Sequence, residues 1–273
     1  MKRYHGVMAA ALVVAAPAVA RAATLGFIET FASPGVGDWG SSTGGGPTNP
    51  GTGGLDGVND GYLLIASSFA ANFGVRGTGP EYVGDWSSAG ITEVTLWLND
   101  VGTDEDFEIH FLISDGFLTT TWQYLEGFHP PHDCWKQFRV DMTDASKWVR
   151  TRGDSSFQDV LRNVDRVTIR HDLAPYVENP NPIRGSLGID HLTLGPVLPA
   201  CQAPFADVDD DGDVDQADFG VFQACLSDPC GRARAECACF DRNRDGVVNA
   251  SDYEVFSKCV SGPMIAADPA CGD

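Results

Sequence analysis

Two stretches of twelve residues near the end of the chain share one pattern. Residues 207–218 are Asp-Val-Asp-Asp-Asp-Gly-Asp-Val-Asp-Gln-Ala-Asp, and residues 241–252 are Asp-Arg-Asn-Arg-Asp-Gly-Val-Val-Asn-Ala-Ser-Asp. Both carry Asp or Asn at positions 1, 3, 5, 9 and 12, and glycine at position 6. The match continues past the loops at the same offset, pairing Phe219 with Tyr253, Phe222 with Phe256, Cys225 with Cys259 and Leu226 with Val260. This spacing places the later residues on one helix face, so the sequence predicts two loop-plus-helix units.

The oxygen-rich side chains of both loops indicate calcium. Calcium takes about six to eight oxygen ligands, which an EF-hand-type loop of about twelve residues supplies from positions 1, 3, 5, 7, 9 and 12. Position 6 must turn sharply, which suits Gly212 and Gly246. An acidic disordered tail would need neither the repeated glycine nor the matching apolar positions. We therefore expect two calcium ions in this region.

Residues 205–262 resemble type I dockerins, which are small modules of secreted proteins that fold around calcium and dock onto cohesin domains. A short segment containing Pro204 precedes the first loop, so each unit has a helix after its loop and none before it. Aspartate at position 12 also matches dockerins. The resemblance implies two ligand sets: Asp207, Asp209, Asp211, Asp215 and Asp218 with the backbone carbonyl of Asp213, and Asp241, Asn243, Asp245, Asn249 and Asp252 with the backbone carbonyl of Val247.

The same resemblance implies a cohesin-like or other cell-surface protein as a partner. Two departures leave that partner open. Positions 10 and 11 of many dockerins carry small hydroxyl residues that contact cohesin, whereas this chain has Gln216-Ala217 and Ala250-Ser251 there. The tail is also richer in cysteine than such dockerins.

The two loops differ in charge. The first contains seven carboxylates, whereas the second has three Asp, two Asn and the flanking cations Arg242 and Arg244. Because the number of charged ligands tunes calcium affinity, we expect the first loop to bind the ion more tightly.

Seven of the eight cysteines lie after residue 200, and Cys134 stands apart from them. In an exported chain this pattern predicts disulfides that stabilise a domain too small for a large core. Since seven is odd, Cys134 is expected to bridge to the tail, with Cys201 the nearest candidate in sequence. A zinc site at Cys237-x-Cys239 is the alternative, although its spacing is shorter than the usual one. The pairing itself is open.

The first 22 residues have the features of a signal peptide. Lys2 and Arg3 precede the apolar run Val7–Ala20, and Ala20-Arg21-Ala22 offers a cleavage site near Ala22. The apolar run is too short for a stable membrane anchor, so we expect secretion to the extracellular space or cell surface without membrane insertion. The net charge of −20 argues against nucleic acid as a partner.

Residues 23–194 are expected to form an antiparallel jelly-roll β-sandwich, followed by a linker at 195–204 and the calcium domain at 205–273. Apolar residues alternate in 94–98, 107–113, 134–142, 167–169 and 187–189, which is typical of strands with one buried face. Between them, Phe157, Val160, Leu161 and Val164 have helical spacing, with Ser155 or Ser156 as the cap. The fold class is thus mainly β with a small α-helical domain.

Several short segments of this region resemble carbohydrate-binding jelly rolls and the related laminin B-type domain: Phe27–Phe31, Gly37–Trp39, Gly84–Ser87, Phe157–Leu161 and Gly188–Leu192. In such domains acids of the first and last strands often share a structural calcium. The resemblance therefore implies a third calcium site at Glu29 and Asp190, with Asp60 assisting. Exposed aromatic rings stack on sugars, and Trp122 with Tyr124 is the pair we expect to do so, although core packing is the alternative for any tryptophan.

Three functions agree with these features. The first is a non-catalytic secreted protein whose sandwich binds carbohydrate or another extracellular ligand and whose tail anchors it. The second is a glycoside hydrolase, with Asp104, Asp106 and Glu108 as candidate acids on alternate positions. The third is a structural surface protein in which calcium only stabilises the fold. His129 and His132 could hold a metal, but they more simply belong to a proline-stiffened loop.

Overall fold

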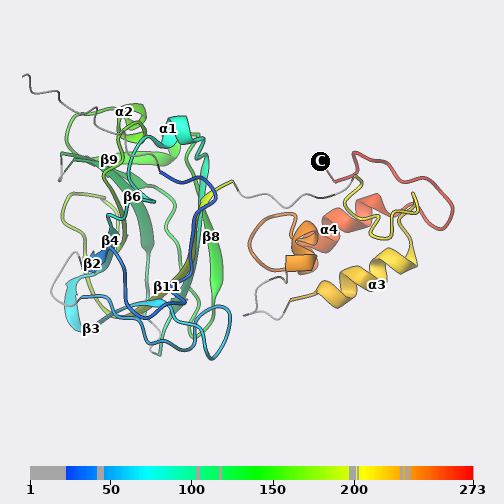
Figure 1. The fold of residues 1–273 in the computed structure, drawn as a ribbon, viewed down its shortest axis with the longest axis horizontal. Helices are drawn as coiled ribbons and strands as arrows, with labels where there is room; N and C mark the ends of the chain where they lie inside the picture. Colours follow the sequence, from blue (N-terminus) through cyan, green and yellow to red (C-terminus); the bar gives the residue numbers. More distant parts are fainter. Residues whose placement is uncertain are drawn as a thin grey trace, which may run out of the picture.

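The computed structural model describes residues 23–41, 46–102, 105–116, 119–196, 201, 203–227, 230, 233 and 235–272. The expected signal peptide, most of the expected linker and Asp104 lie outside these ranges. The chain forms a two-sheet sandwich with a smaller helical part beside it (Figure 1). Within the described part of the chain, no helix is long and apolar enough to cross a membrane.

One sheet of the sandwich has five antiparallel strands. In its main path β1 pairs with β11, β11 with β5 and β5 with β8, and β3 also pairs with β11. The strands are β1 (Ile28–Glu29), β3 (Leu63–Asn72), β5 (Glu93–Asp100), β8 (Lys136–Asp141) and β11 (Pro182–Gly195).

The other sheet has six antiparallel strands in the order β2-β4-β10-β6-β7-β9. They are β2 (Trp39–Ser41), β4 (Gly74–Gly77), β6 (Ile109–Asp115), β7 (Thr120–Tyr124), β9 (Trp148–Arg152) and β10 (Arg166–His171). The mainly β, antiparallel jelly-roll sandwich expected from the sequence is confirmed. Its described loops contain three short helices: α1 (Trp86–Ala89), η1 (Ala145–Lys147) and α2 (Phe157–Leu161).

Alternate side chains of the strands form the core between the sheets. Val94, Leu96 and Leu98 of β5 are fully buried, and Val167 and Ile169 of β10 belong to the same cluster. The residues between them therefore point to the outer faces, as period-two geometry requires. The prediction of a helix near residue 157 is also confirmed, since α2 begins after Ser156, whose hydroxyl accepts the Asp159 amide at 3.2 Å.

A bulge keeps the long strand β11 amphipathic. Leu187 and Ile189 are buried in the core, and the pairing with β5 then shifts around His191, whose φ is 42°. Because a shift of one residue exchanges the two faces of a strand, Leu192 and Leu194 point into the core again after the bulge.

The small part consists of α3 (Gln216–Cys225), η2 (Ala235–Phe240) and α4 (Ala250–Cys259). Helices α3 and α4 each follow one acidic loop, which confirms the predicted loop-plus-helix repeat. Each helix begins with a capping box, formed by Asp215 with Asp218 in α3 and by Asn249 with Asp252 in α4. Phe222, Phe256 and Val248 are among the buried residues that form the core of this part.

All eight cysteines form disulfides: Cys134–Cys230, Cys201–Cys239, Cys225–Cys237 and Cys259–Cys271. Cys134 does bridge to the tail, but the nearest-in-sequence candidate Cys201 is not its partner. The fold brings Cys230 to the start of β8, whereas Cys201 lies against η2. The zinc alternative is wrong because Cys237 and Cys239 are both oxidised. Four disulfides fit an oxidising, extracellular environment.

The second acidic loop contacts the outer face of the five-stranded sheet. The Arg244 guanidinium pairs with the Glu93 carboxylate of β5. A Cβ atom at Gly246 would lie 2.6 Å from the ring of Trp97 and 2.8 Å from Cβ of Gln137, so the loop backbone presses directly on β5 and β8. At the first loop, a Cβ on Gly212 would meet no atom within 4 Å.

This difference makes Gly212 and Gly246 a matched pair for mutation. Both have left-handed φ values, +90° and +87°, so alanine at either position costs roughly 1–3 kcal/mol of backbone strain. We expect Gly246→Ala to lower the melting temperature in calcium more than Gly212→Ala, and to change the fluorescence of Trp97. Equal losses would contradict the contact between the second loop and the sandwich.

Candidate metal loops and ligand-binding groove

The first acidic loop is organised by two buried carboxylates at its ends. Asp207 accepts hydrogen bonds from the amides of Asp211 at 3.2 Å and Gly212 at 3.0 Å. Asp218 accepts the Val208 amide at 2.7 Å and the Asp215 amide at 2.8 Å. Positions 1 and 12 therefore close the loop, and the glycine turn lets the amides of positions 5 and 6 face position 1.

The second loop repeats this arrangement. Asp241 accepts the amides of Asp245 at 3.1 Å and Gly246 at 2.9 Å. Asp252 accepts the Arg242 amide at 2.8 Å and the Asn249 amide at 2.9 Å. The equivalence of the two loops, expected from their matching sequence pattern, thus extends to their hydrogen bonds.

Carboxylates crowd together in the first loop. The oxygens of Asp207, Asp209 and Asp211 lie within 4.8 Å of one another, as do those of Asp213, Asp215 and Asp218. Loss of hydration, followed by the neighbouring negative charges, raises the pKa of Asp209. In the second loop burial, with the charges of Asp252 and Asp245, raises the pKa of Asp241 to about 6.

This donor set fits a hard divalent cation. The groups are oxygen ligands, and their mutual repulsion is relieved when a cation lies among them. The buried Oδ1 atom of Asp213 has no hydrogen-bond partner among the described residues, while its Oδ2 atom accepts the Met264 amide. A buried carboxylate oxygen in this state is costly, which again favours a cation nearby.

A second repeat feature, not recognised in the sequence, joins the two units. The Ser261 hydroxyl accepts the amide of Val214 at 3.0 Å, and the Ser227 hydroxyl accepts the amide of Val248 at 3.0 Å. Each serine also donates its own amide to the same valine's carbonyl. Ser227 and Ser261 are separated by the same number of residues as the two loops. The sequence repeat could therefore have revealed these two serines as equivalent.

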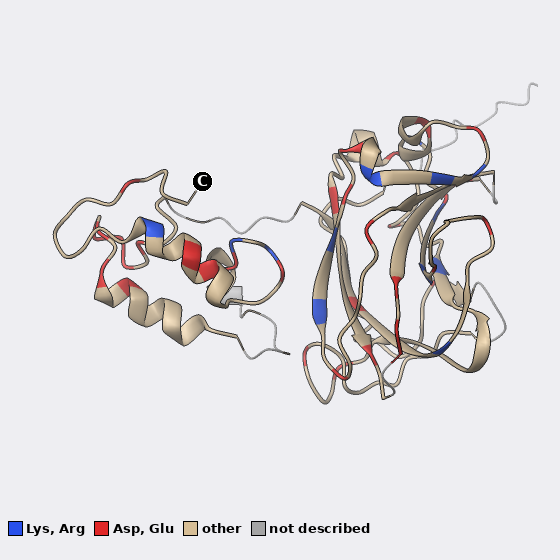
Figure 2. Ribbon diagram, turned by 180° about the vertical axis from the view of Figure 1, so that it is seen from behind, with Lys and Arg blue, Asp and Glu red and all other residues tan. Residues whose placement is uncertain are grey.

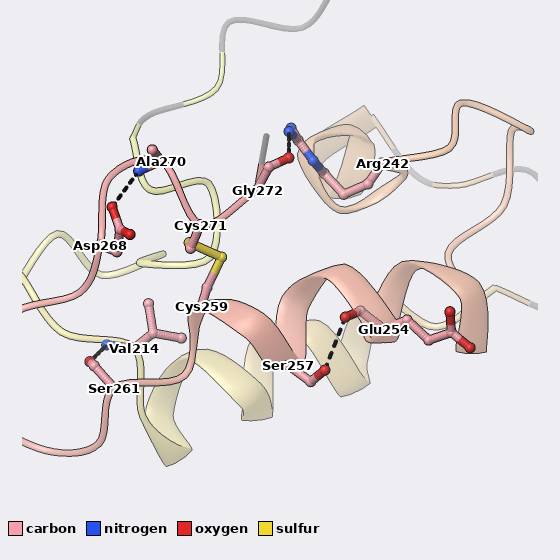
Figure 3. Close-up of a disulfide and its surroundings, with 10 residues drawn as sticks. All are labelled: Val214, Arg242, Glu254, Ser257, Cys259, Ser261, Asp268, Ala270, Cys271 and Gly272. Atoms are coloured by element: carbon pink, nitrogen blue, oxygen red, sulfur yellow. Dashed lines mark hydrogen bonds between the residues drawn. A yellow bond between two sulfur atoms is a disulfide. The ribbon is translucent and has the colours of Figure 1, made fainter.

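The C-terminal segment folds back over the first loop (Figure 3). The Cys259–Cys271 disulfide fixes it to the end of α4, and the Arg242 side chain donates to the Gly272 carbonyl at 2.9 Å. The same guanidinium lies 4.3 Å from the ring centre of Phe205, in a cation–π contact. These contacts attach the chain end to the segments that begin both loops.

The three acids of the expected sandwich site have separate roles. Asp190 accepts the Leu55 amide at 2.8 Å, and Asp60 accepts the Asp56 amide at 2.9 Å, so both organise one loop. Glu29 instead accepts the Tyr82 hydroxyl at 3.0 Å. Among the described residues these three carboxylates do not form a cluster like those of the first loop.

Trp122 and Tyr124 point into the sandwich. Trp122 pairs with core residue Ile113 across the sheet and packs its ring edge-on against Phe157. Tyr124 is 3% exposed and contacts the ring of Trp148. The two aromatics therefore fill the core and form no open platform for a sugar.

Two of the candidate acids of the glycosidase hypothesis, Asp106 and Glu108, lie before β6, which begins only at Ile109, so they do not share a strand face. The Glu108 carboxylate accepts the Tyr176 hydroxyl at 2.8 Å and contacts Nε2 of His110 at 3.0 Å. Burial alone would raise the pKa of Glu108, but these bonds and the His110 charge outweigh it and lower that pKa. A carboxyl group held ionised is unsuited to the role of general acid. His129 bonds the Phe107 carbonyl at 2.8 Å.

A hollow of about 220 Å³ opens on the outer face of the six-stranded sheet. We call it the groove. Its floor carries Arg166, Thr168 and Arg170 of β10, which alternate with the core residues of that strand. Glu178 and the two residues after it, from the loop at 172–181, line its rim. The sequence showed the alternation of β10, but not which neighbours would join it.

Arg170 attaches the rim loop to the floor. Its guanidinium donates to the carbonyls of Val177 at 2.9 Å and Glu178 at 3.0 Å, and to the carboxylate of Asp172 at 2.8 Å. Tyr176 adds its hydrogen bond to Glu108 and an edge contact with His110. The rim is therefore held in place before any ligand arrives.

No family model matches the chain, and no curated protein matches it. Solved structures similar to it include a family 11 carbohydrate-binding module from Clostridium thermocellum in complex with a mixed-linked tetrasaccharide, with 17% identity, 62% of this chain, 95% of that chain and a TM-score of 0.41. An exo-β-agarase has 13% identity, 64% and 25% coverage and a TM-score of 0.47. The CBM22-2 xylan-binding domain from Paenibacillus barcinonensis has 10% identity, 61% and 96% coverage and a TM-score of 0.38. At such identities the function has to follow from the residues.

The hydrogen bond from Tyr176 to Glu108 predicts that removal of the Tyr176 hydroxyl lowers the unfolding free energy by an amount that depends on pH. Because the folded pKa of Glu108 is lowered, its stabilising contribution is present above the unfolded value of about 4.3 and is lost as the pH falls through the folded pKa. Tyr176→Phe removes a donor to the charged carboxylate and should cost about 1–2 kcal/mol at neutral pH.

We expect that difference in unfolding free energy to shrink in acid, as measured by urea denaturation across the pH range. Tyr253→Phe, at an exposed tyrosine of the tail, is the control. A Tyr176→Phe effect that is constant down to acid pH would show that the bond to the ionised carboxylate is not the cause.

Proposed function

We propose that this chain is an exported, non-catalytic adaptor, whose sandwich binds polysaccharide in the groove and whose tail folds around two calcium ions to anchor it to another surface protein. The observation that carries the proposal is the placement of the two elements. The tail contacts the outer face of the five-stranded sheet through Arg244 and Gly246, whereas the groove lies on the outer face of the six-stranded sheet. Figure 1 shows the helical tail beside one face of the sandwich. Because the groove is on the other sheet, a tethered tail would leave it open.

Calcium would be held by the ligand sets that the sequence implies. In the first loop these are Asp207, Asp209, Asp211, Asp215 and Asp218, with the carbonyl of Asp213. In the second they are Asp241, Asn243, Asp245, Asn249 and Asp252, with the carbonyl of Val247. The ion would supply positive charge where acidic residues gather in the loops and first helical turns (Figure 2). The repeated hydrogen bonds and crowded carboxylates support this part of the proposal.

Removal of one ligand from each loop tests the calcium sites. Asp207→Ala and Asp241→Ala should each abolish one of two binding events in calorimetric titration of the full chain and lower its melting temperature in calcium. The site left in Asp241→Ala should be the tighter one, since the first loop has more carboxylates.

Asp210→Asn is the matched control, because Asp210 lies at a left-handed position that asparagine tolerates and is not an expected ligand. Equal calcium affinities of the two remaining sites would contradict the tighter binding expected of the first loop. Two binding events in both alanine variants would contradict the assignment of the calcium sites to these loops.

A bulky residue in the groove tests the sandwich. Thr168 lies on the groove floor, so Thr168→Trp should fill the hollow and abolish the retardation of the protein in gels that contain its polysaccharide. Thr143→Trp, at an exposed threonine after β8, should migrate like the unmodified chain. Unretarded migration of the unmodified protein through every polysaccharide in a broad neutral and acidic panel would overturn the binding function.

A further inference from the structure

The groove has the opposite charge to the rest of the protein. The chain has a net charge of −20, yet four of the thirteen residues that line the groove are arginine and one is glutamate. The arginines are Arg76 of β4, Arg152 of β9 and Arg166 and Arg170 of β10. At physiological salt, charges farther than about 8 Å are largely screened, so a ligand inside the groove would experience mainly these guanidinium groups.

Two of the arginines lie side by side. Arg76 pairs with Thr168 across the sheet, and Arg166 is two residues from Thr168 on the same face. Burial, followed by the positive charge of Arg76, lowers the pKa of Arg166, which is only 4% exposed, and the carboxylate of Asp165 offsets part of this effect. Two like charges at a partly buried site are unfavourable unless an anion lies between them.

The other arginines have their own anions. Arg152 pairs with the Glu178 carboxylate at 2.9 Å, and Arg170 pairs with Asp172 at 2.8 Å. Arg76, in contrast, makes no ion pair with any carboxylate that the structure describes. The guanidinium of Arg76, where β4 meets β10, is therefore the positive charge of the groove that is most open to an anionic ligand.

The remaining lining is suited to hydroxyl groups and not to the apolar face of a sugar. Ser114, Thr121, Thr151 and Thr168 line the groove, and none of the described residues around it is aromatic. The Thr151 hydroxyl and Nε of the buried Arg170 have no hydrogen-bond partner among the described residues. A neutral sugar would find no ring to stack on, whereas an anionic group could be bound by the planar fork of a guanidinium.

We infer that the groove binds an acidic polysaccharide through a carboxylate or sulfate group held between Arg76 and Arg166, with the sugar hydroxyls bonded by the threonines and Ser114. This inference rests on the proposed polysaccharide-binding function and names its ligand class. The anion offsets the repulsion between the two arginines, so binding weakens as salt rises.

Calorimetry with charged and neutral versions of the same oligosaccharides tests the ligand class. The full, calcium-loaded chain is titrated with short galacturonate oligomers and their methyl esters, and with sulfated galactan oligomers and their desulfated forms. At least one charged form should bind about tenfold or more tightly than its neutral counterpart, as expected for one charge-assisted contact. The arm that binds identifies carboxylate or sulfate.

The other outcomes distinguish failure of the acidic-ligand inference from failure of polysaccharide binding itself. Equal or tighter binding of the neutral forms overturns the acidic ligand but keeps polysaccharide binding. Absence of binding to any sugar overturns both. Equal binding of a single-stranded DNA oligonucleotide of the same charge overturns the acidic polysaccharide as the specific ligand.

Substitution of Arg76 tests the site within the groove. Arg76→Gln should weaken binding of the charged oligomer about tenfold with little change in melting temperature, since Arg76 is only half-buried. Arg76→Lys keeps the positive charge but lacks the planar guanidinium group. Its affinity for the charged oligomer should lie between those of the unmodified chain and Arg76→Gln. Arg162→Gln, at an exposed arginine outside the groove, is the control and should bind normally. Unchanged affinity in Arg76→Gln overturns the assignment.

Discussion

Each strand of a two-sheet sandwich has two faces, and the core occupies only one of them. The rest of this structure depends on how the outer faces are used. On β5 the core takes Val94, Leu96 and Leu98, which leaves Trp97 pointing outward. An exposed tryptophan at the middle of a sheet would be an apolar liability, but here it is 2% exposed because the loop around Gly246 lies against it. The tail thus covers the apolar part of the outer face of the five-stranded sheet.

The tail in turn depends on the sandwich and on covalent bonds. Its core contains few large side chains, chiefly Phe222, Phe240 and Phe256, and its first loop concentrates like charges. A unit of this size gains little from burial alone. Three disulfides lie within it, and Cys134–Cys230 attaches it to the sandwich. Calcium, in our proposal, supplies the charge compensation that neither burial nor sulfur provides.

Sequence patterns predicted the features of the fold that depend on the spacing of nearby residues. The period of two gave the strands, the spacing of Phe157, Val160 and Leu161 gave α2, and the constant offset between matching residues gave the repeated loops. Long-range pairing was not available from such patterns. Trp122 and Tyr124 shared a strand face as expected, but only the register with Ile113 shows that this face is the inner one. The partner of Cys134 likewise depends on where the fold brings Cys230.

The groove, too, could not be predicted from the sequence, because it depends on long-range strand pairing. In the sequence, Arg166, Thr168 and Arg170 are simply the polar half of an amphipathic strand, which a solvated sheet face would explain equally well. The register of β10 with β4 places Arg76 beside them, and the rim loop at 172–181 makes the face a hollow. A surface that only needed solvation would have no reason to gather four guanidinium groups under a loop in a chain of net charge −20. Because the tail occupies the opposite sheet, this concentration of positive charge stays open to a ligand while the acidic loops remain on the far side of the molecule.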